Sequence, residues 1–278
     1  MVASRYVTAI GMILVAVVAF AAGMVASPII NPPNTAADPI WDNVTKTGII
    51  RVGTDPTWPP YESINTTSNK IVGFEVDLMN AIAKKLNKTV DWQNVPFGSI
   101  ITSVKSQDLE LGVSGFSITA DRLQEVLFTM PHSTTRGQVI MMQSKRDNLN
   151  ITMLTSLQNL KTLGLKVGTQ SGTTEQKELS AAGVTNSAFG DYGLAIQDMA
   201  GGAPTVDCVY AETPITTSWI AQYQTQGKSI VVIYDIPYYP CAFVANKNAN
   251  TFVAKINGAL SDIIAAGQLD SLRAKWHA

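Results

Sequence analysis

The chain has 278 residues, of which 46% are hydrophobic and 15% are charged, and its formal net charge is -1. This composition is typical of a globular protein and excludes a disordered chain. The length allows one large domain or two of ordinary size. Because nucleic-acid binding needs an excess of basic residues to neutralise phosphates, the balanced charge excludes nucleic acid as a partner.

The N-terminal segment differs from the rest of the chain. An uncharged apolar run extends from Tyr6 to Val25, directly after Arg5. About 20 such residues suffice to span a bilayer core, and the small residues at its end suit a signal-peptide cleavage site. We therefore expect residues 1–26 to be a signal peptide or an N-terminal membrane anchor, followed by a Pro-rich spacer at 27–39. Either interpretation predicts an extracytoplasmic protein, periplasmic or at the cell surface, which an uncleaved segment would hold to the membrane.

Beyond the spacer, patterns typical of strands and helices alternate along the chain. Short apolar runs predict strands at 49–54, 89–93, 109–115, 138–145, 165–169, 206–210, 229–234 and 241–245. Apolar residues at helical spacing predict helices at 74–86, 98–106, 173–182, 191–200, 213–225 and 251–276, the last interrupted at Gly267. This alternation is typical of an α/β fold with mixed, mainly parallel sheets flanked by helices, and its length favours two lobes.

Polar and aromatic side chains follow the predicted strands at the points where the strands end. In open α/β sheets, ligands bind beyond the carboxyl ends of strands, close to helix N-termini. The segments at these ends read DPTW (55–58), VPF (95–97), FSITADR (116–122), QSGTTE (170–175) and AETP (211–214). Because they share this position, we expect them to form a common binding site.

The chemistry of these side chains suits a free amino acid. Arg122 offers a planar guanidinium group to a ligand carboxylate. Glu212 and Asp55 are acceptors that suit an ammonium group, and Trp58 and Phe97 provide flat apolar faces for a side-chain stem. Each residue alone could instead serve packing, capping or a surface ion pair. Their common position at strand ends favours the binding site.

Several separated blocks, in one order, resemble the extracytoplasmic solute-binding proteins of polar amino-acid ABC importers, family 3. The blocks are IIRVGTDPTWPPYES, KIVGFEVDLMNAIAKKL, PFGSIITSV, GVSGFSITADRLQEVLFTMP, LKVGTQSGTT, VDCVYAETP and INGALSDIIAAGQLDSLRAKW. The resemblance covers residues 45–277 and implies the type II periplasmic-binding-protein fold, with two α/β lobes joined by two crossing strands. It also implies a monomer without cofactor that binds a free amino acid and delivers it to ABC transporter permease subunits in the membrane.

The resemblance further implies lobe boundaries. Lobe 1 is expected at 40–132 and 240–278, and lobe 2 at 137–235. The two hinge crossings are expected at 132–137 and 235–240. A ligand trapped between such lobes would stabilise their closed arrangement.

Carried over position by position, the resemblance gives the strand-end residues their roles. Asp55 is expected to bind the distal polar group of the ligand, Trp58 to cover its stem, and Phe97 to form a second apolar wall. The other matching positions are Ser114, Gly115, Ser117 and Arg122 for the α-carboxylate, Gln170, Thr173 and Thr174 in the far lobe, and Glu212 for the α-ammonium group. The family usually has Asp where Glu212 stands, and some relatives have Lys where Gln170 stands.

Charge balance indicates which amino acid the site accepts. Arg122 neutralises the ligand carboxylate and Glu212 its ammonium group, whereas Asp55 is left over because Gln170 has no charge. A buried unpaired carboxylate is costly, so we expect a basic ligand such as arginine, lysine, ornithine or histidine. Glutamine or another neutral polar amino acid is the alternative, since an amide could also donate to Asp55.

Two further function classes are compatible with this fold. The first is a ligand sensor domain for a membrane partner, which an N-terminal anchor permits. The second is a dehydratase-like enzyme, which needs a general acid, with Glu175 and Glu212 as candidates. The chain has two histidines and no cluster with metal-ligand spacing. We therefore expect no metal site and binding rather than catalysis.

The two cysteines allow two interpretations. Export permits a disulfide between Cys208 and Cys241. Both residues lie in apolar strand-like runs, however, where a small buried side chain is the simpler explanation. The second interpretation predicts two free buried thiols.

Overall fold

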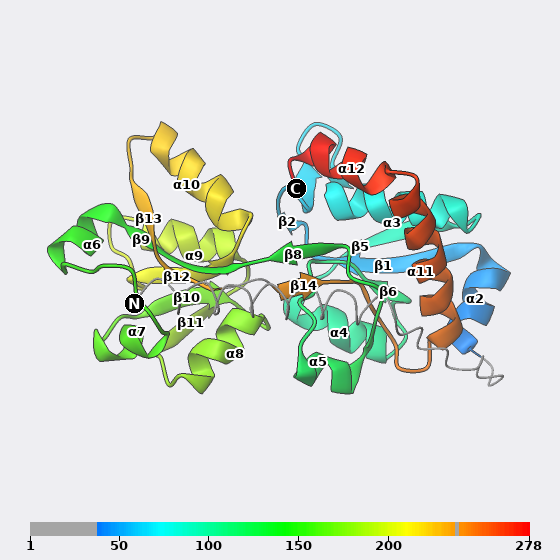
Figure 1. Ribbon diagram of the computed structural model, residues 1–278, viewed down its shortest axis with the longest axis horizontal. Coiled ribbons are helices and arrows are strands. Elements are labelled where there is room, and N and C mark those ends of the chain that lie inside the picture. The colour runs from blue at the N-terminus through cyan, green and yellow to red at the C-terminus, as the bar shows by residue number, and fades with distance from the viewer. Residues whose placement is uncertain (1–37, 237–238) are drawn as a thin grey trace, which may run out of the picture. The chain divides into compact units, whose positions relative to one another are not determined.

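The computed structural model describes residues 38–236 and 239–278. The predicted signal peptide or anchor and nearly all of the predicted spacer lie outside these residues. Figure 1 shows that the described unit, Asp38–Ala278, consists of two groups of elements around separate sheets. Within the described part of the chain, no helix combines the length and the apolar character needed to cross a membrane.

The first group, which we call lobe 1, surrounds a five-stranded sheet in the order β5-β1-β6-β15-β7. Its strands are β1 (Ile49–Thr54), β5 (Thr89–Asn94), β6 (Leu111–Gly112), β7 (Leu127–Phe128) and β15 (Val244–Ala245). Its helices are α2 (Pro39–Thr47), α3 (Phe74–Lys85), α4 (Phe97–Lys105), α5 (Ala120–Glu125), α11 (Asn250–Ala265) and α12 (Gln268–Trp276). A small antiparallel sheet lies between β1 and α3 in the chain and consists of β2 (Thr57–Trp58), β3 (Glu62–Asn65) and β4 (Lys70–Val72).

The second group, which we call lobe 2, surrounds a sheet in the order β11-β10-β12-β9-β13. Its strands are β9 (Gly137–Met142), β10 (Val167–Gln170), β11 (Asn186–Phe189), β12 (Cys208–Glu212) and β13 (Ile230–Asp235). Its helices are α6 (Gln143–Asn148), α7 (Gln158–Thr162), α8 (Thr174–Ala181), α9 (Tyr192–Met199) and α10 (Ile215–Thr225).

One strand in each sheet runs against the other four. In lobe 1, β15 is antiparallel to both of its neighbours, whereas β1 is parallel to β5 and β6. In lobe 2, β9 is antiparallel to both of its neighbours, whereas β10 is parallel to β11 and β12. The predicted fold class, two lobes with mixed and mainly parallel sheets, is therefore confirmed.

Two short strands connect the lobes. They are β8 (Ser133–Thr135) and β14 (Tyr239–Cys241), which pair antiparallel with Tyr239 opposite Thr135. Figure 1 shows this pair between the two sheets. After β8 the chain enters β9, and after β14 it enters β15, so each reversed strand is the first one after a crossing. That residues 132–137 and 235–240 act as hinges remains a prediction.

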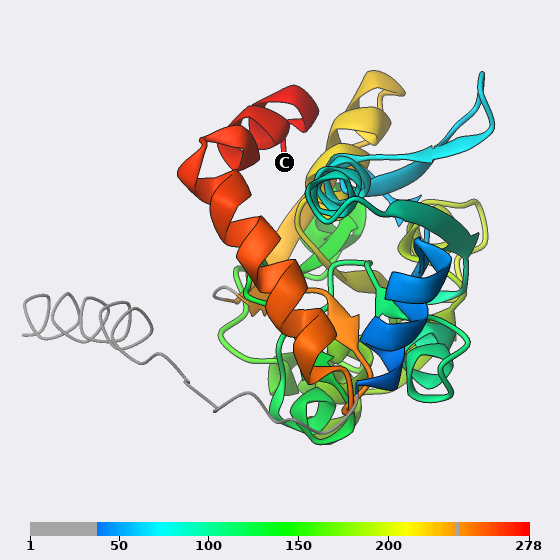
Figure 2. The same ribbon diagram turned by 90° about the vertical axis from the view of Figure 1, so that its right-hand side faces the viewer.

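Helix α2 illustrates how local sequence and tertiary contacts agree. Its N-cap is Asp38, one carboxylate oxygen of which accepts hydrogen bonds from the backbone N–H groups of Ile40 and Trp41, at 3.1 and 3.0 Å. The helix ends at Gly48, which takes the left-handed conformation with φ 74°. The other Asp38 oxygen accepts from the Phe252 N–H at 2.9 Å and so ties α2 to α11, which lies beside it in Figure 2.

Three predicted strands differ from the observed elements. The predicted strand 138–145 ends at Met142, because the polar segment after it forms α6. The predicted strand 109–115 is reduced to β6, and beyond it the backbone turns at Gly115 with φ 56°. The predicted strand 241–245 is divided between β14 and β15, since Cys241 still pairs with the connecting strand β8.

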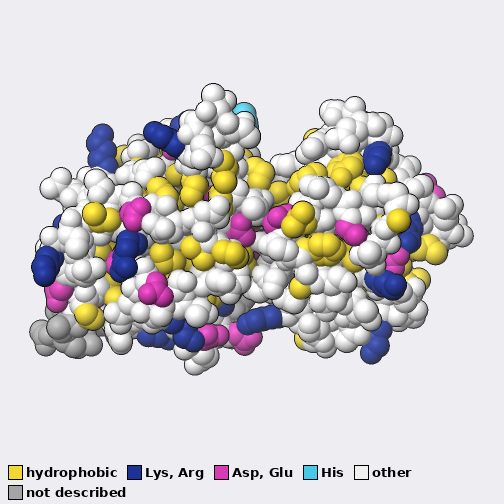
Figure 3. Space-filling model, turned by 180° about the vertical axis from the view of Figure 1, so that it is seen from behind, with side chains coloured by type: hydrophobic (Ala, Val, Ile, Leu, Met, Phe, Trp, Pro, Cys, Tyr) yellow, Lys and Arg dark blue, Asp and Glu magenta, His cyan; other side chains and the backbone are white. Residues whose placement is uncertain are grey.

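Apolar side chains form the buried core of the described chain. One cluster of buried apolar side chains includes residues of both lobes, among them Trp58 of lobe 1 and Tyr192 of lobe 2. Cys208 and Cys241 are both buried and unpaired, as the interpretation of free thiols predicts. On the face shown in Figure 3, basic and acidic side chains are interspersed over both lobes.

Candidate ligand-binding cleft

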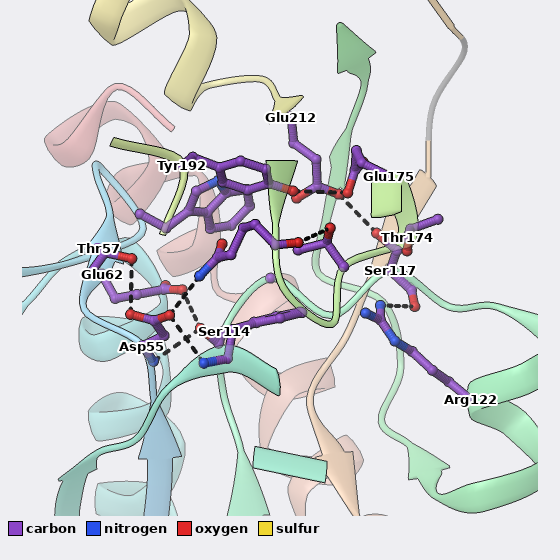
Figure 4. A pocket seen from close by; sticks show the side chains of 15 residues that line it. Asp55, Thr57, Glu62, Ser114, Ser117, Arg122, Thr174, Glu175, Tyr192 and Glu212 are labelled. Atoms are coloured by element: carbon purple, nitrogen blue, oxygen red, sulfur yellow. Dashed lines mark hydrogen bonds between the residues drawn. The ribbon is translucent and has the colours of Figure 1, made fainter. Parts of the chain in front are cut away.

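A cavity bounded by both lobes encloses about 330 Å³ of space not filled by protein atoms (Figure 4). It brings together all the site residues predicted from the sequence, which are Asp55, Trp58, Phe97, Ser114, Gly115, Ser117, Arg122, Gln170, Thr173, Thr174 and Glu212. The sequence analysis assigned no ligand contact to four further lining residues, which are Thr57, Glu62, Glu175 and Tyr192. Ligand contacts of these residues remain predictions, but the structure supplies their geometry.

Asp55 lies just after β1 and is held by donors from both lobes. Its Oδ1 accepts from the Thr57 hydroxyl at 2.9 Å, and its Oδ2 accepts from the Phe97 N–H at 3.1 Å. The side-chain amide of Gln170, from lobe 2, donates to Oδ2 at 2.8 Å. Burial raises the pKa of Asp55, although these hydrogen bonds oppose the shift. The Asp55 charge therefore has hydrogen-bond donors but no cation beside it among these partners.

Glu62 extends this acidic end of the cavity. The Ser114 hydroxyl accepts from the Asp55 N–H at 3.2 Å and donates to Glu62 Oε1 at 2.9 Å. Glu62 is fully buried, and its Oε2 has no hydrogen-bond partner within the described residues. Burial, followed by the charge of Glu75, raises the pKa of Glu62 well above its usual value.

The other end of the cavity holds the buried Arg122. Its guanidinium donates to the Ser117 carbonyl at 3.0 Å and to the Gly172 carbonyl of lobe 2 at 3.3 Å. It also lies over the rings of Phe97 and Phe116, at 5.5 and 5.4 Å from their centroids. Burial lowers the pKa of Arg122. No ion pair of the described region involves Arg122, so its charge is available to an anionic ligand group.

Glu212 stands at the end of β12 and reaches out of its own lobe. Its Oε1 accepts from the Ser117 hydroxyl of lobe 1 at 3.0 Å and from the Thr135 hydroxyl of β8 at 3.0 Å. Burial, followed by the charge of Glu175, raises the pKa of Glu212 well above its usual value. Glu212 therefore makes a direct contact between the lobes. Its side chain is one methylene longer than the Asp that the resemblance led us to expect at this position.

Gly115 shapes the wall on which Trp58 rests. A Cβ at Gly115 would lie 2.3 Å from Trp58 Cζ3, and the residue has a left-handed φ of 56°. The Gly115 N–H donates to Glu75 Oε2 at 3.0 Å, within lobe 1. Trp58 packs on Tyr61 with ring centroids 4.5 Å apart, and its Nε1 has no hydrogen-bond partner in the described chain.

Helix α8 begins at the cavity wall of lobe 2. Thr173 is its N-cap, and the Thr173 hydroxyl accepts from the Gln176 N–H at 3.3 Å. In the first turn, the buried Glu175 accepts from the Tyr192 hydroxyl at 2.8 Å through Oε2. Burial raises the pKa of Glu175 to about 7, while hydrogen bonds from its own backbone and from Tyr192 oppose the shift. The Thr174 hydroxyl is buried without a partner in the described chain.

Different signals would have been needed to find the missed residues. Thr57 and Glu175 lie in segments already singled out at strand ends, so the strand-end rule could have included them. Glu62 reaches the cavity only because the small β2-β3-β4 sheet folds back toward Ser114. Tyr192 follows β11, a short polar strand that the sequence pattern did not predict.

The described residues contain no group of three or more His, Cys, Asp or Glu side chains that could hold a metal ion. The cavity instead has two ends of opposite character. Figure 4 shows Asp55, Glu62 and Ser114 together on one side, and Ser117 and Arg122 on the other. Such a cleft can hold a small molecule with a carboxylate at one end and hydrogen-bond donors or a cation at the other.

Residues 50–278 match the family model described as bacterial extracellular solute-binding proteins, family 3. The chain belongs to this family. It is 31% identical to the putative ABC transporter arginine-binding protein 2 of Escherichia coli K12, over 84% of this chain and 93% of that protein. Membership confirms the predicted resemblance, and the family's extracellular description agrees with the predicted extracytoplasmic location.

Two solved structures give the same result for the fold. An ancestral arginine-binding protein bound to arginine is 28% identical, with a TM-score of 0.73, and covers 83% of this chain and 99% of its own. The P235GK mutant of ArgBP from T. maritima, at 22% identity, has a TM-score of 0.76 over 86% of this chain and 99% of its own. The second likeness concerns the fold alone.

Proposed function

We propose that the protein binds a free amino acid with a cationic side chain outside the cytoplasm and delivers it to an ABC importer. The observation that carries the proposal is the charge of the cavity. Four buried carboxylates line it, from Asp55, Glu62, Glu175 and Glu212, against one cation, Arg122. A basic amino acid carries a net positive charge that these carboxyl groups can balance when they ionise, whereas a neutral or acidic one brings no such charge.

The two ends of the cavity suggest one orientation for the ligand. The α-carboxylate faces Arg122, which can form two parallel hydrogen bonds with it. The α-ammonium group lies near Glu212, and the side chain extends along Trp58 toward Asp55. The Gln170 amide, which now donates to Asp55, would share that carboxylate with the ligand or turn aside.

The names of the relatives support a basic ligand. The Escherichia coli relative and the ancestral protein described above are both named for arginine binding. Another ancestral structure, at 29% identity, is titled as an arginine-binding protein bound to glutamine. Glutamine is therefore the second candidate ligand, since its amide can donate to Asp55 without a charge.

Delivery would depend on closure of the lobes around the ligand. Hydrogen bonds already join the lobes at three places, which are Asp55–Gln170, Ser117–Glu212 and Arg122–Gly172. A ligand held by Arg122 on one lobe and Glu212 on the other would add contacts that exist only in the closed form. The permease would then recognise the closed form. We propose that the protein acts as a monomer and performs no catalysis, with residues 1–26 serving as its signal peptide or its anchor.

A calorimetric screen tests the proposal. The purified protein, freed of bound ligand by unfolding and refolding, is titrated with arginine, lysine, ornithine, histidine, glutamine and glutamate. We expect the tightest binding with a basic amino acid and none with glutamate. Tightest binding with glutamine would replace the ligand class and keep the binding function. Mass spectrometry of the titrated mixtures checks for products, and any ligand conversion would contradict a purely binding role.

A further inference from the structure

Two buried carboxylates of the cleft have no role in the ligand orientation described above. They are Glu62 of lobe 1 and Glu175 of lobe 2, with 0% and 1% of their surface exposed. Both line the cavity, and Figure 4 shows their side chains on different walls of it. Buried titratable groups in a binding cleft are unusual enough to require a physical explanation.

Each of these carboxylates has one satisfied oxygen and one without a partner. Ser114 donates to Glu62 Oε1 at 2.9 Å, and Tyr192 donates to Glu175 Oε2 at 2.8 Å. Glu62 Oε2 and Glu175 Oε1 accept no hydrogen bond from any other described residue. Asp55 differs, because both of its oxygens accept. Since an ionised carboxylate needs several donors when it is buried, the neutral acid is the better tolerated form at Glu62 and Glu175.

The environment of both residues also favours the neutral acid. Burial is the largest cause of the raised pKa of each, and further negative charge adds to it. The titratable groups that face Glu62 are Glu75, Asp55 and Glu212. Those that face Glu175 are Glu178 on its own helix, Arg122 on α5, Tyr192 on α9, Glu212 and Tyr210 on β12, and Tyr239 on β14. Arg122 is the single cation among them, and the proposed ligand carboxylate would occupy it.

We propose that Glu62 and Glu175 select a cationic ligand by releasing a proton when it binds. This inference rests on the proposed function. Both carboxyls are neutral in the ligand-free cleft, and together they lose one proton when the ligand enters, because its single net positive charge balances one new carboxylate charge. The carboxyl O–H bond breaks, the proton passes to the buffer, and the ligand cation balances the charge that remains. The ligand N–H groups then supply the donors that the two unpartnered oxygens lack. A neutral ligand cannot replace these protons, so its binding leaves both groups protonated.

The test measures protons released for each ligand bound. Arginine is titrated into the protein at pH 6 in buffers of different ionisation enthalpy, and the dependence of the observed heat on that enthalpy gives the proton count. We expect about one proton more per arginine than per glutamine, with arginine affinity rising up to about tenfold per pH unit for each proton released. Glutamine, used as the neutral probe, gives the baseline, because its α-ammonium group can displace a proton only at Glu212.

Two isosteric variants assign the protons. Glu62→Gln and Glu175→Gln should each lower the count for arginine, and the double variant should bring it down to the count measured with glutamine. The control is Glu125→Gln, an exposed carboxylate on α5 paired with Lys105 at 2.8 Å, which should leave the count unchanged. The wild-type measurement already decides the proposal if a variant does not fold.

The outcomes separate this inference from the proposed function. Arginine binding without proton release at pH 6, or with a release that neither variant reduces, would overturn the inference alone. Failure of every amino acid to bind at any pH between 5 and 8 would overturn the proposed function and the inference together. A proton release that is larger with arginine than with glutamine, and is reduced in the variants, would establish both.

Discussion

The two lobes contribute to the cleft in different ways. The cavity residues of lobe 1 are largely held by partners within the same lobe, as in the chain of hydrogen bonds from Asp55 through Ser114 to Glu62. The polar residues of lobe 2 reach outward instead, since Gln170 donates to Asp55 and Glu212 accepts from Ser117. We therefore interpret lobe 1 as a preorganised platform, which lobe 2 would complete if the lobes close as proposed. Preorganisation lowers the ordering cost of binding, so we expect the ligand to dock first on lobe 1.

The largest expected effect is at the platform. Arg122→Ala removes the only cation that lines the described cavity, and we expect a loss of about 2–5 kcal/mol of ligand binding, because the ligand carboxylate stays buried without a partner. Calorimetry measures it as a rise of Kd of at least about 30-fold. The matched control is Arg146→Ala on α6, whose neighbour is Asp147. Binding within about threefold of wild type would remove Arg122 from the platform.

The next effect is a pH dependence of the free energy of unfolding, which we expect from Glu175 in lobe 2. Glu175 has a folded pKa of about 7, above its usual value of 4.5. Its neutral form is therefore favoured by the fold, and the stability that it contributes is present below pH 4.5 and lost as pH rises through 7. We expect the free energy of unfolding without ligand to fall by about 3 kcal/mol over this window. Urea unfolding at pH 4.5 and 8 measures it, and Glu175→Gln should flatten the dependence; an unchanged slope would exclude Glu175 as its source.

Asp55 tests how the platform reads the ligand side chain. Asp55→Asn keeps the shape but removes the charge, so we expect a basic ligand to lose about 1.5–3 kcal/mol. Glutamine should change by less than about threefold, because an amide needs an acceptor and not a charge. Titrations of both ligands into wild type and variant give the comparison. Equal losses for arginine and glutamine would mean that Asp55 does not recognise charge. Asp91→Asn, on the exposed part of β5, is the control.

A smaller effect is expected where the lobes meet. Ser117→Ala removes the hydroxyl that donates to Glu212 across the cleft, a hydrogen bond of 3.0 Å. The net contribution of such a bond is about 0.5–1.5 kcal/mol, so ligand affinity should fall by roughly two- to tenfold. Small-angle scattering without ligand should show a larger mean radius of gyration for the variant. Tighter binding would indicate that this contact competes with the ligand.

The smallest effect concerns the exposed rim. Lys177 of α8 lies 3.3 Å from Asp121 of α5, and both side chains are more than half exposed. Exposed pairs contribute little and are screened by salt, so Lys177→Ala should change affinity by less than about threefold at low salt. The difference should become smaller at about 0.5 M salt, where the screening length falls to roughly 4 Å. A large effect that persists in salt would give the rim a role that its exposure does not predict.

The local sequence pattern was sufficient to predict which polar and aromatic residues follow the strands. Ile49–Thr54 was predicted as a strand with its observed bounds, and the segment after it contains Asp55 and Trp58, which line the cavity. The reason is that alternation, turn residues and strand ends are encoded over a few neighbouring residues. The same rule placed Arg122 and Glu212 at strand ends without knowledge of which strands are neighbours.

Only the tertiary structure determined which hydrogen-bond partners these groups have. Asp55 and Gln170 are 115 residues apart in the chain, yet they share a hydrogen bond of 2.8 Å. Glu62 joins the site through Ser114 because a small sheet folds back, and Glu175 is buried against Tyr192 from another helix. Burial, and with it the pKa of each carboxyl, depends on every element packed around the group. No local pattern carries that information, which is why the burial of Glu62 and Glu175 and the proton exchange that we propose for them could be inferred only from the fold.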